Sequence, residues 1–263
     1  MSSNKESTAR TLAVALVVSL VAAVFVAGSA VYLKPVQEQN RQIDKQRSIL
    51  AIAGIGDAAL SAGEVRALFE RRIEAQVIDL TTGEIDTSRD PATFDALKAA
   101  RDPATSVALP GDKDIALIKR REQFATVYRL ENDDGQLEAL ILPVRGYGLW
   151  STLYGFLAIA PDLNTVIGLG FYQHGETPGL GGEVDNPKWK AHWPGKTLFD
   201  DAGHPAIRIV KGGVPPGSPD AAHQVDALAG ATLTSKGVDH LLAFWLGEQG
   251  FGPYLDKLRR DGA

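Results

Sequence analysis

The chain has no cysteine among its 263 residues. It can therefore form neither disulfides nor a cysteine-ligated zinc site or iron–sulfur cluster. Clustered basic residues are also lacking, and the formal net charge of -5 argues against a nucleic-acid partner, because neutralising phosphates requires a basic face. If the protein transfers electrons, it therefore needs an organic cofactor or a haem.

The paired histidine spacing that is typical of metal sites is missing as well. We therefore expect no metal ion in this protein. His174 is the strongest exception because it directly precedes a glycine-rich loop. The histidines are His174, His192, His204, His223 and His240.

One uncharged run near the amino terminus, residues 11–33, is long enough to cross a bilayer. Its 22 mostly apolar positions from residue 12 onward would form a helix of about 33 Å at ~1.5 Å per residue. A cleaved signal peptide is the alternative, because the small residues 28–30 resemble a cleavage site. Signal h-regions span about 7–15 residues, so the length favours a retained transmembrane helix, preceded by a tail of residues 1–10, over a signal peptide or a buried soluble helix.

The charges that flank this run leave its orientation open. Lys5 and Arg10 precede it, whereas four basic residues follow it within a short distance. A simple count of these charges places the following domain in the cytoplasm. Large domains, however, translocate with little regard to such counts. The four following residues are Lys34, Arg41, Lys45 and Arg47.

Residues 34–50 are expected to form a stalk, helical over the polar run 37–47, and residues 51–263 one globular domain. Pro35 predicts the end of the straight membrane helix, because proline lacks the N–H group that continues a helix. Ile43, Ile49 and Leu50 are the stalk residues that we expect to touch the domain.

Apolar periodicity predicts mainly strands in this domain. Two turn signals, Asn-Asp-Asp-Gly at residues 132–135 and Pro-Asp-Leu-Asn at residues 161–164, join four of them into hairpins. Consecutive hairpins with helices at the beginning and end indicate an α+β domain around a mainly antiparallel sheet. The predicted strands are residues 75–80, 126–130, 137–144, 154–160, 165–172 and 207–211, and the predicted helices are residues 64–73 and 235–249.

Two glycine-rich stretches are candidate sites: GETPGLGGE at residues 175–183 and DALAGATLTS at residues 226–235. The first lacks the lysine and the serine or threonine that end a P-loop, and neither has the strand-GxGxxG-helix pattern of dinucleotide-binding folds. From the residues alone, each stretch can equally be a surface loop, with Thr232 or Ser235 capping the last helix.

Residues 146–193 resemble the corresponding stretch of the NqrC family, which belongs to the bacterial sodium-translocating NADH:quinone reductases, above all in the segment GGEVDNPKW. Residues 226–232 are similar to the flavinylation motif of that family, an aspartate followed three residues later by Ser or Thr and then by Gly-Ala-Thr. Ala229 stands where Ser or Thr is usual. The residues that fit the motif are Asp226, Gly230, Ala231 and Thr232.

The resemblance implies a membrane-anchored electron carrier that holds FMN covalently through Thr232. It implies a subunit of an enzyme that passes electrons from NADH toward ubiquinone and exports sodium, without binding NADH itself. The implied location is the bacterial inner membrane, with the flavin domain in the periplasm. The implied partners are the other subunits, the membrane and, during maturation, a flavin transferase. The alternatives are an RnfG-type subunit of an ion-translocating ferredoxin:NAD oxidoreductase and a non-catalytic FMN-binding module of a membrane regulator.

The resemblance also implies a flavin site that both glycine-rich stretches build. Trp150 is our candidate for stacking on the flavin ring, and Lys211 for countering the phosphate charge. Without the resemblance, Trp150 would be assigned to the core and Lys211 to a solvated strand. We assign Trp189, Trp193 and Trp245 to packing. The other implied site residues are Glu176, Thr177, Leu180, Gly181, Thr234 and Ser235.

Overall fold

The structure is a computed structural model that describes residues 7–57 and 59–262, so the first six residues of the expected tail lie outside the described residues. The chain divides into two compact units, Met1–Asp44 and Lys45–Ala263. The helices are α1 (Thr8–Ile52), α2 (Ala62–Arg72), α3 (Ala96–Ala99), α4 (Pro187–Lys190), α5 (Thr232–Leu246) and α6 (Gly252–Asp261), with the 3-10 helices η1 (Gly181–Asp185) and η2 (Ala221–His223). The strands are β1 (Ile73–Asp79), β2 (Ser106–Ala108), β3 (Arg120–Glu122), β4 (Phe124–Glu131), β5 (Leu137–Tyr147), β6 (Thr152–Ile159), β7 (Val166–Gln173), β8 (Arg208–Val210) and β9 (Gln224–Asp226).

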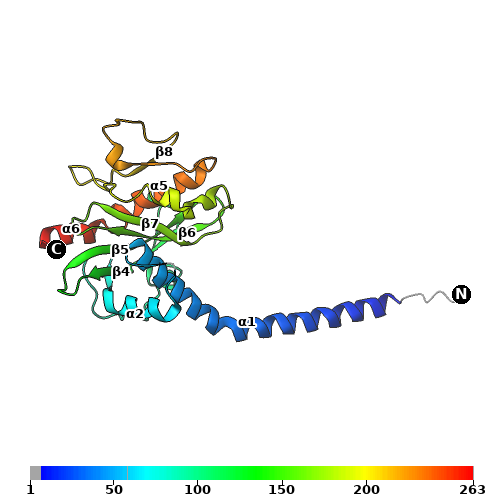
Figure 1. Cartoon of the computed structure of the whole chain (residues 1–263). Helices are drawn as coiled ribbons and strands as arrows, with labels where there is room; N and C mark the ends of the chain where they lie inside the picture. The colour runs from blue at the N-terminus through cyan, green and yellow to red at the C-terminus, as the bar shows by residue number, and fades with distance from the viewer. Residues whose placement is uncertain (1–6, 58, 263) are drawn as a thin grey trace. The chain divides into compact units, whose positions relative to one another are not determined.

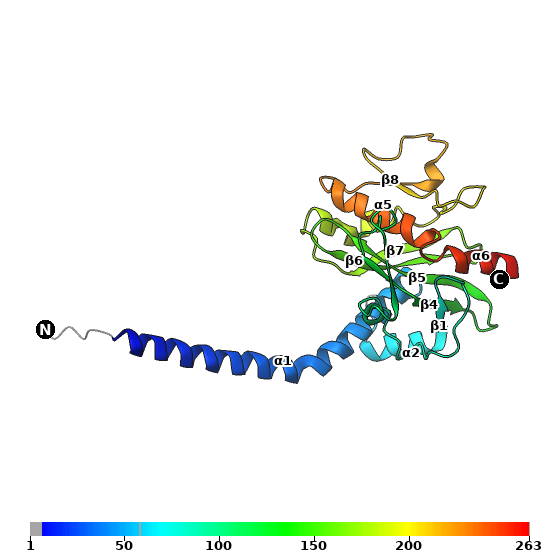
Figure 2. The same cartoon turned by 180° about the vertical axis from the view of Figure 1, so that it is seen from behind.

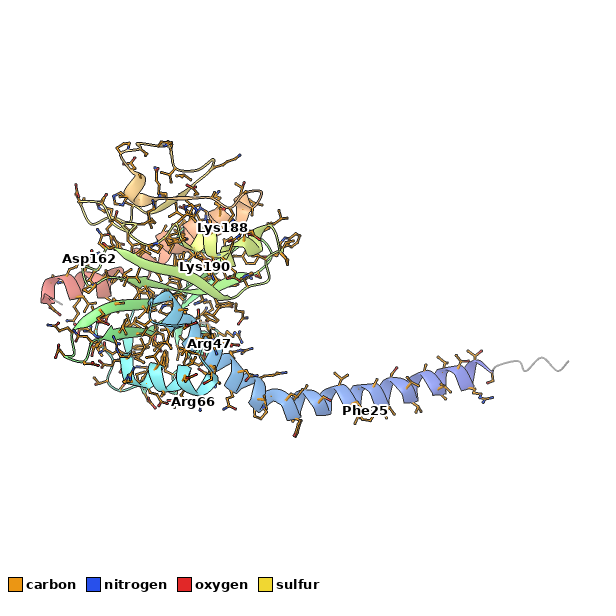
Figure 3. All side chains as sticks on the ribbon, in the orientation of Figure 1. Phe25, Arg47, Arg66, Asp162, Lys188 and Lys190 are labelled. Carbon is orange, nitrogen blue, oxygen red and sulfur yellow. The ribbon has the colours of Figure 1, made fainter. Side chains whose placement is uncertain are left out.

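Helix α1 is continuous and runs through Pro35, so the helix does not end at this proline, and the stalk is helical as expected. A proline removes one hydrogen bond, and the helical residues on both sides of it keep theirs. By length and composition α1 can cross a membrane, a test that a signal sequence also passes. Its apolar side chains are exposed, as Figure 3 shows for Phe25, which is 73% exposed. The helix therefore fits a single-pass membrane protein.

The carboxyl end of α1 belongs to the second unit, which begins at Lys45. Ile49 and Leu50 are fully buried there, as expected of residues that touch the domain. Gly168 of β7 leaves room for this segment, because a Cβ atom at Gly168 would lie 2.7 Å from the carbonyl oxygen of Ile52. The last turns of α1 are therefore part of the domain core and not of a linker.

Five antiparallel strands form the main sheet, in the order β1-β4-β5-β6-β7. The two predicted hairpins are present, and Asp162 fixes the second by accepting the N–H groups of Asn164 and Thr165 at 2.9 and 2.8 Å. Figures 1 and 2 show α5 and α2 on opposite sides of this sheet. The expected α+β class with a mainly antiparallel sheet is confirmed.

Each face of the sheet buries its own set of side chains, because neighbouring residues of a strand point to opposite faces. Leu140 and Leu142 of β5 belong to a large apolar cluster that includes residues of α5 and α6. On the other face, Tyr128 of β4 pairs with Ile141 of β5, and its ring lies 6.1 Å from that of Phe69 of α2. Helix α2 thus packs on the sheet, as its periodicity predicts.

The predicted strand at residues 207–211 exists as β8, but it lies outside the main sheet. It pairs in parallel with β9, a strand that the sequence did not reveal, in a separate two-stranded sheet. Asp239 of α5 supports this small sheet, since its carboxylate accepts the N–H of Ile209 at 2.8 Å. Strand β9 consequently leads the chain straight into the second glycine-rich stretch.

Candidate functional site

Three segments that are distant in sequence meet at one point of the domain. They are the β5–β6 turn (residues 148–151), the β7–η1 loop (residues 174–180) and the first turn of α5. The carboxylate of Glu176 joins them, and the Glu176 residue is only 5% exposed. Sequence reasoning placed Glu176 in the site but did not reveal this role.

Every bond of the Glu176 carboxylate goes to a protein donor. Its Oε1 accepts the N–H groups of Leu149, Trp150 and Ser151 at 3.1, 2.9 and 3.1 Å. Its Oε2 accepts the hydroxyl of Thr234 at 2.7 Å. The carboxylate therefore ties the turn that carries Trp150 to the helix that begins with Thr232.

These hydrogen bonds also set the charge state of Glu176. Burial alone would raise its pKa, but the hydroxyl of Thr234 and the amides of the β5–β6 turn stabilise the ionised form and lower the pKa below its usual value. Glu176 is consequently ionised at neutral pH, and it orders the site as an anion.

Glycines allow the three segments to approach this closely. A Cβ atom at Gly148 would lie 2.7 Å from Oε1 of Glu176, and one at Gly181 would lie 2.5 Å from the hydroxyl oxygen of Thr234. A Cβ atom at Gly237 of α5 would lie 2.4 Å from the carbonyl oxygen of Tyr147. Of these three glycines, the sequence pointed to Gly181 alone as a site residue.

Helix α5 begins at Thr232, three residues earlier than the sequence predicted. Its N-cap is Ala231, and no side chain among the described residues caps it. Thr234 and Ser235 are buried inside the first turns, so the alternative in which Thr232 or Ser235 caps the helix is wrong. The hydroxyl of Ser235 instead accepts the N–H of Leu228 and donates to the carbonyl oxygen of Ala231, both at 3.0 Å.

Thr232 lies exposed at the amino end of this helix. In the stretches 7–57 and 59–262, the N–H groups of Thr232, Leu233 and Thr234 have no protein acceptor, as is usual for the first turn of a helix. Gly230, two residues before Thr232, has a φ of 72°. Its backbone conformation therefore favours glycine, and the turn it makes exposes the threonine hydroxyl.

Asp226 holds the segment that leads to Thr232. Its carboxylate accepts the N–H of Val214 at 2.7 Å, and its carbonyl oxygen accepts the indole N–H of Trp189 at 2.8 Å. Asp226 therefore fixes the protein backbone. Lys211 is exposed beside this segment, and the part of the chain that the structure describes gives it no ion pair.

Trp150 is 67% exposed, so the alternative assignment of this residue to the core is wrong. Leu180 and Leu233 are exposed as well, at 47% and 57%. A Cβ atom at Gly230 would lie 3.4 Å from Leu180, which places this leucine beside the segment before Thr232. The other tryptophans are buried, as assigned: Trp189, Trp193 and Trp245.

The Nε2 atom of His174 lies 2.8 Å from the carboxylate of Asp185, and its Nδ1 accepts the N–H of Glu176 at 3.2 Å. Both ring nitrogens thus have protein partners. Within residues 7–57 and 59–262, no group of three or more possible metal ligands comes together.

Comparison of the chain with known proteins shows to which protein family it belongs. A family model described as an FMN-binding domain matches residues 148–247, which contain the β5–β6 turn, the β7–η1 loop and α5. The NqrC protein of the Na(+)-translocating NADH-quinone reductase of Pseudomonas aeruginosa is 66% identical, over 99% of both chains. The chain belongs to the NqrC family.

Membership in the NqrC family decides against the RnfG-type and regulator alternatives. The NqrC protein of Yersinia pestis is 51% identical, over 97% of this chain and 95% of that protein. The crystal structure of Shewanella oneidensis NqrC superposes with a TM-score of 0.76 at 40% identity, covering 84% of this chain and 99% of that one. The NqrC protein of Parabacteroides distasonis gives a TM-score of 0.66 at 29% identity, covering 85% and 96%.

Proposed function

We propose that the chain, as the NqrC-type electron-transfer subunit of a Na+-translocating NADH:quinone reductase, carries FMN as a phosphoester on Thr232. The observation that carries this proposal is the exposed position of Thr232 at the uncapped start of α5, a helix that Glu176 ties to the turn carrying the exposed Trp150. Bound FMN would supply one- or two-electron transfer between the electron donors and acceptors of the complex.

The start of α5 fits a phosphodiester. Such a group keeps one negative charge, and the free N–H groups and the dipole at a helix N-terminus stabilise an anion. Lys211 would add a positive charge near this segment, because the preceding Val210 accepts the N–H of Ala227. Gly230 and Ala231 leave the hydroxyl of Thr232 accessible to a modifying enzyme, which we infer to be a flavin transferase.

The surroundings fit a flavin ring. Trp150 offers an exposed aromatic face, and Leu180 offers an exposed apolar side chain next to Gly230. Thr177 shapes the loop between them, because its carbonyl oxygen accepts the N–H groups of Leu180 and Gly182 at 3.1 and 2.9 Å. Glu176, Thr234 and Ser235 would act by positioning these groups, since their own polar atoms are bonded to protein.

We also infer that α1 anchors the chain in the bacterial inner membrane, with the flavin domain in the periplasm and the other subunits of the reductase around it. A covalent bond prevents cofactor loss where free FMN cannot be replenished. The bond therefore suits a site outside the cytoplasm.

The test is a substitution at the acceptor. Thr232→Ala should fold normally, with a free energy of unfolding within about 0.5 kcal/mol of wild type, because the residue is exposed and caps nothing. It should carry no covalent flavin after co-expression with a flavin transferase. Peptide mass mapping would look for one FMN less water on the peptide that contains residues 230–236.

Thr234→Ala is the control, since it removes a threonine hydroxyl two residues away and keeps the acceptor. This variant should lose some stability with the bond to Glu176, yet retain its flavin. Covalent FMN on the Thr232→Ala variant, or a flavin-free wild type in the presence of the transferase, would refute the attachment.

A further inference from the structure

A cationic pocket opens beside the β5–β6 turn. Its volume is about 320 Å³, and its walls include Arg101, Lys119, Arg120, Tyr147 and Tyr154. None of the described residues that line it is acidic. The pocket is therefore locally basic in a chain whose formal net charge is -5.

The loop that forms one wall of this cationic pocket is held in a strained conformation. Leu117 and Lys119 have φ angles of 53° and 63°, which residues other than glycine rarely adopt. The buried Asp114 enforces it, because its two carboxylate oxygens accept the N–H groups of Ile118 and Lys119, each at 2.8 Å. Strain of this kind persists where the surrounding structure over-determines it, and it clusters at functional sites.

Four cationic residues line the pocket, and one of them, Arg145, is neutralised by an ion pair with the buried Glu122. Across residues 7–57 and 59–262, neither Arg101 nor Lys119 nor Arg120 forms an ion pair. The guanidinium of Arg120 is oriented by Ser106, to whose hydroxyl and carbonyl oxygens it donates at 2.8 and 3.0 Å. The pocket therefore offers fixed positive charge to an anion from outside.

Exposed apolar side chains continue from the cationic pocket to the proposed flavin site. Leu117 is 59% exposed and Tyr147 40%, and the N–H of Tyr147 donates to the carbonyl oxygen of Ala116 at 2.8 Å. Tyr147 directly precedes the turn that carries Leu149, 38% exposed, and Trp150. The cations and these side chains consequently form one surface.

We infer that this surface docks an acidic segment of another protein of the reductase complex, whose carboxylates enter the cationic pocket while its apolar side chains cover Leu117, Tyr147 and Leu149. The inference rests on the proposed function, which places the flavin beside Trp150 and so requires a redox partner to approach this side. Arginine and aromatic residues are enriched in protein interfaces, and complementary charge orients an encounter. A free anion would leave the exposed apolar side chains without a partner.

The test compares two charge reversals in the full chain, expressed with the other subunits. Arg101→Glu with Lys119→Glu reverses the rim of the cationic pocket, where both residues are exposed. Arg66→Glu with Lys188→Glu makes the same change of charge on α2 and α4, at two residues labelled in Figure 3. Neither residue lines the pocket. The complex is purified through a tag on another subunit, and both the retained amount of this chain and the NADH-driven reduction rate of its flavin are measured.

The pocket variant should lose at least tenfold in retention or in reduction rate, and the control should match wild type. Arg101→Gln with Lys119→Gln should shift the same quantities in the same direction, which separates charge from misfolding. Equal behaviour of pocket variant and control would overturn the inference. The inference would also be overturned if the pocket variant were retained like wild type but, unlike wild type, no longer bound inorganic phosphate or anionic lipid vesicles.

Covalent FMN on Thr232, measured by peptide mass, should be the same in all these variants. A wild type without covalent flavin would contradict the proposed attachment. The retention measurement would still decide the docking surface, because it does not depend on the flavin.

Discussion

Glu176 is the residue on which the geometry of the site depends most. Its four donors come from segments 25 to 58 residues away in the sequence. Hydrogen bonds to a charged acceptor contribute more than those between neutral groups, and a buried donor that loses its acceptor is costly. One carboxylate therefore couples the position of Trp150 to that of α5.

Glu176→Gln should lower the free energy of unfolding at pH 7 by about 1–3 kcal/mol, because the neutral amide accepts weakly and turns its own N–H groups toward donors. The pKa of Glu176 is lowered in the folded state, so its contribution is fully present above the unfolded pKa of about 4.3. The contribution is lost as the pH falls through the folded pKa. Denaturant unfolding at several pH values should therefore show the difference between wild type and variant shrinking below about pH 4.3.

Glu70→Gln is the matched control, because Glu70 is exposed on α2 and far from the site in sequence. It should unfold like wild type at pH 7. If Glu176→Gln also unfolded like wild type at pH 7, the carboxylate would not hold the three segments together.

At the scale of elements, the hairpins were predictable because their signals are local. Alternating side chains and the turn Asn-Asp-Asp-Gly predict β4 and β5, and the structure confirms both within a few residues at their ends. The start of α5 was misjudged because Thr234 and Ser235 are residues that commonly cap helices. Their hydroxyls are instead buried against Glu176 and Leu228, which only the tertiary fold brings near.

The candidate site shows the same division between local and distant information. The two glycine-rich stretches are visible in the sequence, and the resemblance to the NqrC family singles out Thr232 within the second. Gly148 and Gly237 could not be predicted as site residues, because they are needed only where the end of β5 approaches α5 in the folded domain. The strand β9 was missed because three residues are too few to show a period.

Gly237→Ala tests this approach. The added methyl group would lie 2.4 Å from the carbonyl oxygen of Tyr147 and 2.9 Å from Cα of Gly148, both backbone atoms, so the helix and the turn must separate. We expect a loss of about 1–3 kcal/mol in the free energy of unfolding. The fluorescence of the bound flavin should change as well, because Trp150 would move relative to Thr232.

Gly63→Ala on α2 provides the comparison, since nothing lies within 4 Å of a Cβ atom there. It should be neutral or stabilising by about 0.4–1 kcal/mol, because alanine has fewer conformations to lose. Thermal melting of both variants measures the difference. Equal stability would mean that α5 and the β5–β6 turn are not in tight contact.

At the scale of the whole molecule, the two units need different surroundings, one apolar and one aqueous. The described part of the first unit lies in an exposed helix whose apolar run fits a lipid environment, and the second unit is a folded domain whose sheet buries side chains on both faces. The members of the NqrC family to which this chain is similar match it over both units, so the helix and the domain belong to one protein. For a chain that α1 anchors in a membrane, as we propose, the side on which the domain lies decides which partners the domain can meet.

The last prediction is that the domain lies in the periplasm, although four basic residues follow the membrane span and two precede it. Positive charge after a span favours the cytoplasm, but a large domain translocates with little regard to it. Alkaline phosphatase, which is active only outside the cytoplasm, should be active when fused after Ala263. A fluorescent reporter that works only in the cytoplasm should stay dark at the same position, so each fusion controls the other. An inactive phosphatase together with a bright reporter would reverse the topology, and a covalent bond to Thr232 would then need a reason other than cofactor loss.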